Sequence, residues 1–175
     1  MSGMFASERL VMRPLRADDA DALHVAYRDE ALMRYWSSAP HVSLEETRAY
    51  VAGRVDKTDW RSWVITVAGD DTAIGTLAAL PRRPGVSEIG YLLARSAWGK
   101  GYAREAVTRL IDLLIREEGH RRVFADTDPD NVGSNRLLES LGFRLEGVLR
   151  AEWETHIGVR DTNLWGLLAD EWKAR

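Results

Sequence analysis

The sequence of 175 residues contains no cysteine. This excludes disulfides, thiolate zinc sites and a cysteine nucleophile, and it agrees with a reducing compartment. The chain also lacks an excess of basic residues, because its formal net charge of −3 gives no electrostatic footprint for nucleic acid. It shows neither a signal-peptide apolar block nor an apolar run of membrane-spanning length. We therefore expect a soluble, cytoplasmic protein without a nucleic-acid or membrane partner.

What the sequence does contain is enough apolar material for a core. Hydrophobic residues make up 45% of the chain, which suits one globular domain over residues 1–175. Seven tryptophans are many for this length, so we expect some in the core and a few at a pocket.

The order of periodic segments predicts an α/β domain with a mixed sheet. Alternation over residues 10–15 predicts a short first strand that Pro14 places near an edge or at its end. Early helices follow, including one over about 44–56 with a Ser43–Glu46 capping box. Residues 60–94 predict a three-stranded meander and 103–118 a helix with one apolar face. The remaining pattern predicts a strand over 121–127, a helix over 131–142 and two long final strands.

Two glycines surround a lysine in W-G-K-G-Y-A, residues 98–103, directly before the helix that begins near 103. The segment is not a P-loop, because Lys100 is followed by Gly101, nor a dinucleotide fingerprint, because position 104 is arginine. Gly99 and Gly101 let consecutive N–H groups turn inward as an anion nest at the positive end of the helix dipole, with Lys100 adding charge. The segment indicates phosphate binding; a plain turn without a ligand is the alternative.

At this point the sequence resembles a family. W-G-K-G-Y-A after G-Y-L-L-A-R-S-A resembles the acetyl-CoA pyrophosphate loop of GNAT-type N-acetyltransferases. Downstream, R-R-V-F-A-D-T-D-P-D-N, then N-V-G-S-N-R-L-L-E-S-L-G-F and R-L-E-G-V-L-R, is similar to the branch that acetylates ribosomal-protein N-termini. The first strand E-R-L-V-M-R-P-L and the last, R-D-T-N-L-W-G-L-L, extend the resemblance over nearly the whole chain. It implies the GNAT fold, with a mixed, largely antiparallel sheet of about seven strands flanked by helices.

The resemblance also implies acetyl-CoA as co-substrate and direct attack of an amine on the thioester, which agrees with the absence of cysteine. The end of the third meander strand would pair with the pantetheine arm like an extra strand, and a bulge there would aim an N–H at the thioester oxygen. At the first loop position Trp98 stands where the superfamily often has Gln or Arg. The residues implied in cofactor binding are Leu92, Leu93, Ala94, Trp98, Gly99, Lys100, Gly101, Tyr102, Ala103 and Asn131.

Asn131 and Ser134 lie three apart at the start of a predicted helix, and therefore on one face. Asn131 either caps the helix, a position that asparagine favours, or, by the resemblance, bonds the pantetheine. Ser134 is either solvated or lies near the departing sulfur. Many family members have a tyrosine seven residues after this asparagine as general acid. Here the position is Leu138, so Ser134 is the available substitute, donating a proton or ordering a water.

The general base must deprotonate an ammonium near neutral pH. The resemblance favours Glu152 in R-A-E-W-E-T-H as this base. Glu154 stays a candidate because the spacing from Phe143 to Glu152 is about one residue shorter than the family pattern. Strand alternation puts the two glutamates on one face and Trp153 on the other. The plain alternative is a pair of solvent-facing strand carboxylates.

The acceptor side is less determined. His41 and His156 titrate in a useful range, and Tyr35, Trp36 and His41 either line an acceptor groove or anchor the core. Asp161 resembles a family position with a structural role. The histidines show no metal-binding spacing, so we expect no metal.

The leading hypothesis is an N-acetyltransferase acting on a protein N-terminus or on a small amine such as an antibiotic or a polyamine. One alternative is a non-catalytic acyl-CoA-binding module that serves as a sensor or interaction surface. The other is a fold that binds no CoA at all. A homodimer through the last strands or the early helices is plausible in this fold.

Overall fold

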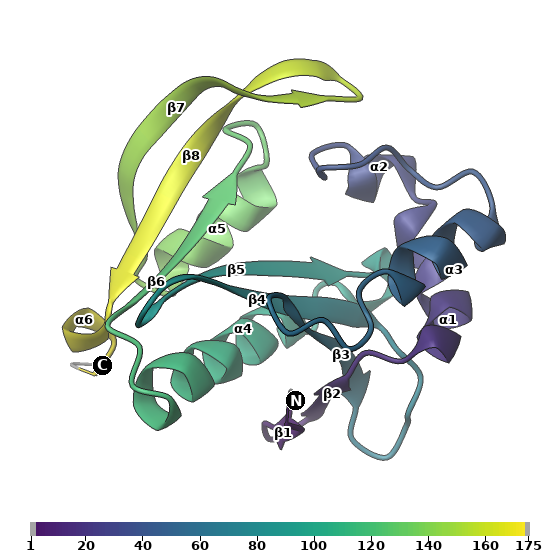
Figure 1. Cartoon of the computed structure of the whole chain (residues 1–175), viewed down its shortest axis with the longest axis horizontal. Helices are drawn as coiled ribbons and strands as arrows, with labels where there is room; N and C mark the ends of the chain where they lie inside the picture. Colours follow the sequence, from purple (N-terminus) through teal and green to yellow (C-terminus); the bar gives the residue numbers. More distant parts are fainter. Residues whose placement is uncertain (1–2, 174–175) are drawn as a thin grey trace.

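The computed structural model describes residues 3–173, and it arranges eight strands in one sheet of order β1-β2-β3-β4-β5-β6-β8-β7 (Figure 1). All neighbouring strands are antiparallel except β5 and β6, so the prediction of a mixed, largely antiparallel sheet is confirmed. The eighth strand, beyond the seven expected, is the two-residue β1. The strands are β1 (Phe5–Ala6), β2 (Leu10–Pro14), β3 (Arg61–Val67), β4 (Gly75–Arg83), β5 (Val86–Leu93), β6 (Arg122–Thr127), β7 (Arg144–Thr155) and β8 (Gly158–Leu168).

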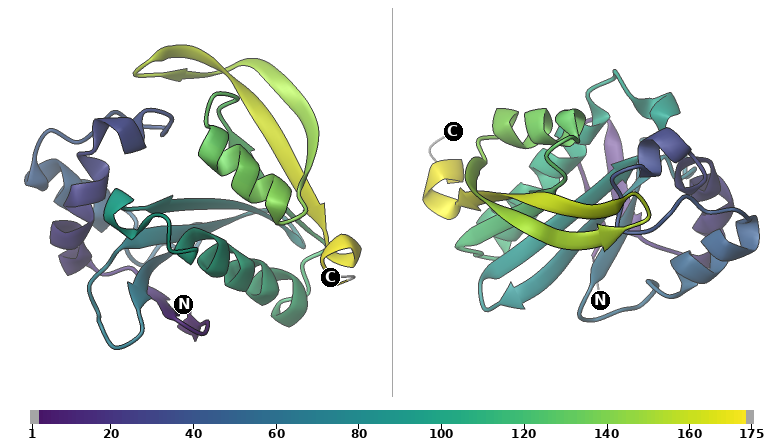
Figure 2. Two further views of the ribbon diagram at one scale, coloured as in Figure 1. Left: turned by 180° about the vertical axis from the view of Figure 1, so that it is seen from behind. Right: turned by 90° about the horizontal axis from the view of Figure 1, so that it is seen from above.

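Helices cover both faces of the sheet (Figure 2). One face carries the early helices and the other carries α4 and α5, and each side has its own apolar cluster. The helices are α1 (Ala20–Tyr27), α2 (Glu30–Met33), α3 (Leu44–Ala52), α4 (Tyr102–Asp112), α5 (Val132–Ser140) and α6 (Ala169–Lys173), with a π-helical turn over Leu113–Glu117. Within residues 3–173, no helix is long and apolar enough to cross a membrane.

The apolar pattern explains why these elements pack as they do. In β3 the run Trp63–Ile65 is buried on both faces, as expected for a strand in the middle of a sheet. On α4 the apolar stripe includes Val107, Leu110 and Ile111, all fully buried against the sheet. Trp63 lies in the same core and donates its indole N–H to the carbonyl of Gly3 at 2.8 Å.

The two parallel strands in the centre of the sheet separate along their length. β5 and β6 pair only at Val86–Arg122, Ser87–Val123 and Glu88–Phe124, at the start of each strand. Beyond these pairs the strands diverge toward their carboxyl ends (Figure 1). The chain that leaves β5 there leads into α4, and the chain that leaves β6 leads into α5. The result is a V-shaped opening in the sheet, with the first turns of α4 and α5 at its wide end.

β7 and β8 form a long hairpin whose tip approaches the segment around α2 (Figure 1). The pairing is irregular once near the middle, between Leu149–Thr162 and Trp153–Arg160, where β7 carries extra residues. β7 is the edge strand, and most of its side chains are exposed.

Candidate active site

The loop between β5 and α4 contains two glycines with positive φ angles and a run of unpartnered backbone N–H groups. Gly99 and Gly101 have φ angles of +76° and +79°, a conformation that favours glycine, and Gly101 is the residue before the first turn of α4. Among the contacts of residues 3–173, the backbone N–H groups from Gly99 to Arg104 have no hydrogen-bond acceptor. Unpartnered N–H groups at a helix start, with the positive end of its dipole, bind phosphate well.

Arg9 holds this loop in place through side-chain contacts, a role that the sequence analysis did not predict. Its guanidinium donates to the carbonyl oxygen of Lys100 at 3.0 Å and to Glu105 of α4 at 2.7 Å, and it lies over the ring of Tyr102. Burial raises the pKa of Glu105, but hydrogen bonds from Ser7 and Arg9 outweigh it and hold that pKa below its ordinary value. The contacts join residues more than 90 positions apart, so no local pattern could have revealed them.

At the end of β5, adjacent residues present their backbone to different sides. The Ala94 N–H donates to the carbonyl of Ile74 at 2.9 Å, toward β4. Because alternate residues of a strand direct their N–H and C=O groups to opposite neighbours, those of Tyr91 and Leu93 face the opening, and those of Leu92 face β4. β5 pairs with β4 in unbroken register from Ser87 to Leu93. The expected bulge at residues 92–94 is therefore wrong: the space arises because β5 and β6 separate.

Trp98 closes the corner between strand and loop. The residue is 52% exposed, and its indole N–H donates to the carbonyl of Leu93 at 2.8 Å. Trp98 thus fixes the loop against the strand and occupies one acceptor of the open edge. Lys100 is exposed, whereas Tyr102 and Ala103 pack partly against the main core.

At the other side of the opening, Asn131 directly precedes α5. Its side-chain oxygen accepts the Ser134 N–H at 3.3 Å, so Asn131 caps the helix. Leu138 is fully buried in the core.

Tyr91, which sequence reasoning missed, reaches from β5 to α5. Its hydroxyl donates to the main-chain carbonyl of Ser134 at 3.5 Å, and burial raises its pKa to about 12. A titratable side chain among the apolar residues at the end of the strand was the available signal. Tyr91 and Ser134 therefore lie together across the opening.

Carboxylates line the opening on the face of the sheet opposite to Tyr91 and α5. Glu88 alternates with Tyr91 along β5, and so faces the side that carries α1 to α3. Burial raises the pKa of Glu88, the charge of Asp126 on β6 adds to this, and a hydrogen bond from Arg82 only partly offsets them. Asp126 accepts the indole N–H of Trp153 at 3.0 Å, which ties the hairpin to β6. This face therefore carries a partly buried carboxyl whose pKa is closer to neutrality than that of an ordinary glutamate.

The irregularity in β7 determines how Glu152 is presented. Glu152 lies in the bulge, and Glu154 lies beyond it in regular register with Val159. Ala151 has a φ of +52°, and its N–H donates to the side chain of Asp161 at 2.8 Å. Asp161 thus holds the bulge, in agreement with the structural role expected for it. Simple alternation does not describe Glu152, although both glutamates are exposed.

The early aromatic residues anchor the second cluster. His41 is buried and stacks on Tyr27, and its Nδ1 lies 2.8 Å from the Thr47 hydroxyl. Burial is the main reason why the pKa of His41 is lowered. Trp36 packs against the same cluster and donates to the Tyr50 hydroxyl at 3.1 Å. The sequence left two roles open for these aromatic residues, an acceptor groove or a core anchor, and the contacts of Trp36 are those of a core anchor.

Comparison with known proteins identifies the family. Residues 9–144 match the model described as "Acetyltransferase (GNAT) domain". The chain is 32% identical over 171 residues to the uncharacterized N-acetyltransferase p20 of Bacillus licheniformis, covering 95% of this chain and 96% of that protein. A putative acetyltransferase from T. thermophilus superposes with a TM-score of 0.88 at 26% identity, covering 99% of this chain and 93% of that one. The chain belongs to the GNAT acetyltransferase family.

Two of the similar solved structures belong to acetyltransferases that are named for their acceptor. One is a spermidine N-acetyltransferase from Vibrio cholerae in complex with CoA and spermine, at 21% identity and a TM-score of 0.81, covering 95% and 99% of the two chains. The other is RimL, a ribosomal L7/L12 alpha-N-protein acetyltransferase, at 23% identity and a TM-score of 0.83, covering 94% and 93%. At these identities the likeness shows the fold, and the range of acceptors shows that the fold serves several amines. Family membership and the N-acetyltransferase homologues support acetyl transfer to an amine by this chain.

Proposed function

We propose that the protein is a cytoplasmic N-acetyltransferase that transfers the acetyl group of acetyl-CoA directly to a primary amine. The observation that carries this proposal is the opening between β5 and β6, with unpartnered N–H groups at one corner and titratable side chains on both faces. Acetyl-CoA supplies an activated thioester. The amine nitrogen forms the new C–N bond as the C–S bond breaks; the amine gives up a proton, and the sulfur takes one.

In this proposal the loop and the strand edge hold the co-substrate. The N–H groups of Gly99 to Ala103 bind the pyrophosphate, and Lys100 adds positive charge. The open edge of β5 at Leu92 to Ala94 lies beside the pantetheine arm, with Leu93 presenting the groups that point to the opening. The side-chain amide of Asn131 keeps its N–H₂ group for the same arm, because its oxygen caps α5.

A carboxylate takes the proton from the acceptor ammonium. Glu152 is the first candidate, from the family resemblance, and the bulge held by Asp161 presents it at the hairpin. Glu88 is the second candidate, and its surroundings favour it: it is partly buried, its pKa is raised, and it lies where the strands begin to separate.

A hydroxyl returns a proton to the sulfur. Leu138 cannot do so, and Ser134 is the residue proposed from the sequence. The Tyr91 phenol is a second donor, because at 3.5 Å its bond to the Ser134 carbonyl is at the long limit for a hydrogen bond. A phenol with the ordinary tyrosine pKa is already protonated at neutral pH, and burial raises the pKa of Tyr91 further.

Glutamine variants of Glu152, Glu154 and Glu88 test the base, with kcat/KM measured against pH at saturating acetyl-CoA. Loss of the base lowers kcat/KM by about 10²–10⁴-fold and leaves acetyl-CoA affinity unchanged. If Glu88 is the base, wild-type activity falls as pH drops through a pKa above that of ordinary glutamate, and E88Q removes that limb. Unchanged turnover in E152Q removes Glu152 from the mechanism.

The donor is tested with Y91F, S134A and the double variant. If either hydroxyl protonates the leaving sulfur, its removal slows kcat at constant acetyl-CoA affinity, and the effect shrinks with a more acidic thiol as leaving group. A kcat equal to wild type in the double variant shows that neither hydroxyl takes part.

The edge strand β7 supports a homodimer in this proposal. Leu145, Val148, Leu149 and Trp153 are each more than 40% exposed along it. Light scattering on the purified chain measures the oligomeric state directly.

A further inference from the structure

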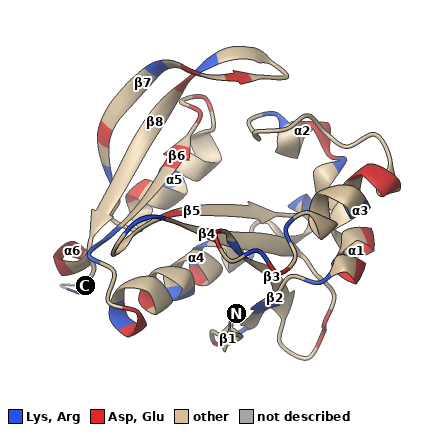
Figure 3. Cartoon of the chain, viewed as in Figure 1, with Lys and Arg blue, Asp and Glu red and all other residues tan. Residues whose placement is uncertain are grey.

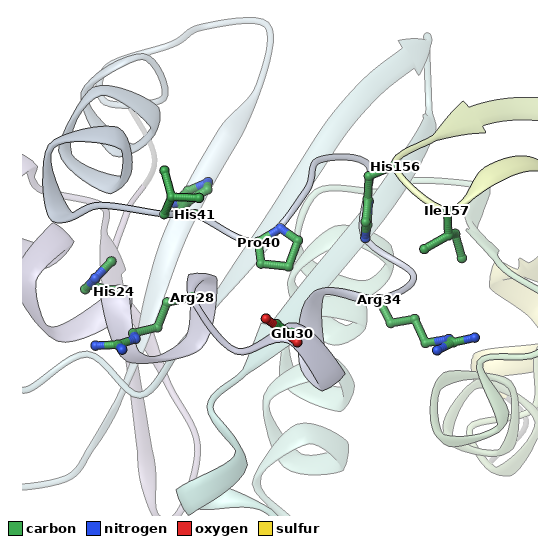
Figure 4. A pocket seen from close by; sticks show the side chains of 9 residues that line it. His24, Arg28, Glu30, Arg34, Pro40, His41, His156 and Ile157 are labelled. Carbon is green, nitrogen blue, oxygen red and sulfur yellow. The ribbon is translucent and has the colours of Figure 1, made fainter.

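The surface next to the opening contains a hollow of about 700 Å³ between the α1–α2 segment and the tip of the β7–β8 hairpin (Figure 4). Its size is that of a small-molecule site. The ionisable side chains that line it are two arginines, three histidines and one glutamate: His24, Arg28, Glu30, Arg34, His41 and His156.

The sign of this lining differs from that of the chain as a whole. Two arginines face one glutamate in the hollow, whereas the protein has a formal net charge of −3. Other arginines in or against the early helices form ion pairs: Arg48 pairs with Asp21 and Arg95 with Asp29. Neither Arg28 nor Arg34 has a carboxylate oxygen within 4.0 Å anywhere in the part of the chain that the structure describes. The Arg34 guanidinium lies over the ring of Tyr35, 5.7 Å from its centroid, but neither arginine has an ion-pair partner among the described residues.

The hollow lies beside the reacting end of the opening. α2 begins at Asp29, which accepts a hydrogen bond of 2.6 Å from Arg95, directly after β5. Hydrogen bonds from Arg160 chiefly, with the charge of Arg34 contributing, hold the pKa of Asp128 below its usual range, which places Arg34 near the end of β6. Arg160 binds both oxygens of Asp128, at 2.7 and 2.9 Å, and Arg34 acts on this carboxylate only through its charge, without a direct ion pair.

The two arginines extend to opposite ends of the hollow, with Glu30 between them (Figure 4). Arg34 points to the side of the hairpin tip, where His156 hangs into the hollow, and Arg28 points to the side of His24 (Figure 4). Figure 3 shows the basic residues around α2 in the context of the whole chain. Arg34 is therefore the cation on the side of the opening, and Arg28 makes the outer end positive.

We infer that the acceptor is a small amine that also carries an anionic oxygen group, a carboxylate or a phosphate, which Arg34 binds while the amine enters the opening. This inference rests on the proposed acetyl transfer. Guanidinium groups bind both oxyanions in paired hydrogen bonds, and His156 can add a further donor. A polyamine, which carries several positive charges and no anionic group, meets two unpaired arginines and is a poor acceptor here.

The test uses the full chain at saturating acetyl-CoA and measures CoA thiol release with matched acceptors. The common α-amino acids are each compared with their carboxamide and with the decarboxylated amine; an aminoalkyl phosphate and spermidine complete the set. We expect kcat/KM for an acid or a phosphate to exceed that of its neutral counterpart by about tenfold to a hundredfold. The acid and phosphate arms identify which oxyanion is bound.

R34Q should bring the acid and neutral members of a pair to similar kcat/KM, with activity on the neutral amine and acetyl-CoA affinity unchanged, and R34K should restore part of the preference. R28Q should reduce the preference less. R83Q, at an exposed arginine at the far end of β4, is the matched control and should keep the wild-type preference. Arg34 is exposed, so its variants should fold, which thermal unfolding verifies.

Equal or better acetylation of spermidine or of the neutral amines overturns the inference and leaves acetyl transfer intact. So does an acid preference that R34Q does not change. If no amine of any kind releases thiol although acetyl-CoA binds, the proposed acetyl transfer itself is wrong, and the inference falls with it.

Discussion

Replacing Gly101 with valine tests whether the loop after β5 holds a phosphate. Gly101 has a φ of +79°, and a Cβ placed there would meet the Arg9 guanidinium at 3.4 Å, an ordinary contact. Steric clash is therefore not the main effect. An L-residue in the left-handed region costs about 1–2 kcal/mol, and a β-branched one is least tolerated. The loop relieves this strain by rotating, and rotation turns the N–H groups of Gly101 and Tyr102 away from a common point.

The loss of one such N–H from a bound phosphate sets the size of the effect. A hydrogen bond to a charged group contributes about 1.5–3 kcal/mol, so acetyl-CoA should bind about tenfold to a hundredfold more weakly. Gly69, in the turn between β3 and β4, provides the control: its φ is +88° and nothing lies within 4 Å of a Cβ built there. G69V carries a similar backbone strain without touching the loop.

Calorimetric titration with acetyl-CoA, together with chemical denaturation, separates the two effects. Both variants should lose a similar amount of stability, and only G101V should lose affinity. If G101V binds acetyl-CoA as tightly as wild type, the glycine loop is a plain turn and the reasoning fails. If G69V loses affinity equally, the effect is one of global stability.

Two further predictions concern residues that position the site. R9A removes the bond to the Lys100 carbonyl and the ion pair with Glu105, so acetyl-CoA affinity should fall by about tenfold while kcat at saturation stays near wild type. Calorimetry measures the affinity and steady-state kinetics measure kcat. An unchanged affinity contradicts the role of Arg9. D161A frees the Ala151 N–H and lets the bulge relax, so kcat should fall while acetyl-CoA affinity stays constant. Equal kcat in D161A and wild type would show that the bulge does not position a reacting group.

The parts of the fold that could be predicted from the sequence are those in which a pattern of apolar residues marks the buried face of an element. The stripe on α4, the apolar run of β3 and the glycines before α4 each indicate their structure locally, because the cause lies within one element. The two-residue β1 was not predicted, because two residues carry no period. The bulge expected in β5 was wrong because the space between β5 and β6 comes from the divergence of two strands, which neither strand encodes alone.

The site was predicted less completely. Arg9 and Tyr91 act through contacts that span the chain, and the loop that Arg9 supports lies more than 90 residues away. Asn131 shows a different limit: the sequence left open whether it caps the helix or bonds a ligand, and the structure shows the cap. The pKa of Glu88 depends on burial and on Asp126 from another strand, so it too could not be read from the sequence.

The central claim is that this opening transfers an acetyl group to an amine. The most direct test incubates the purified protein with acetyl-CoA and a panel of amines, follows free CoA thiol, and identifies the product by mass spectrometry. The account predicts thiol release that depends on the amine, one acetylated amine for each thiol released, and no acetylated protein as intermediate. Tight binding of acetyl-CoA without an acetylated product for any amine would contradict it, and would leave a module that binds acyl-CoA without catalysis.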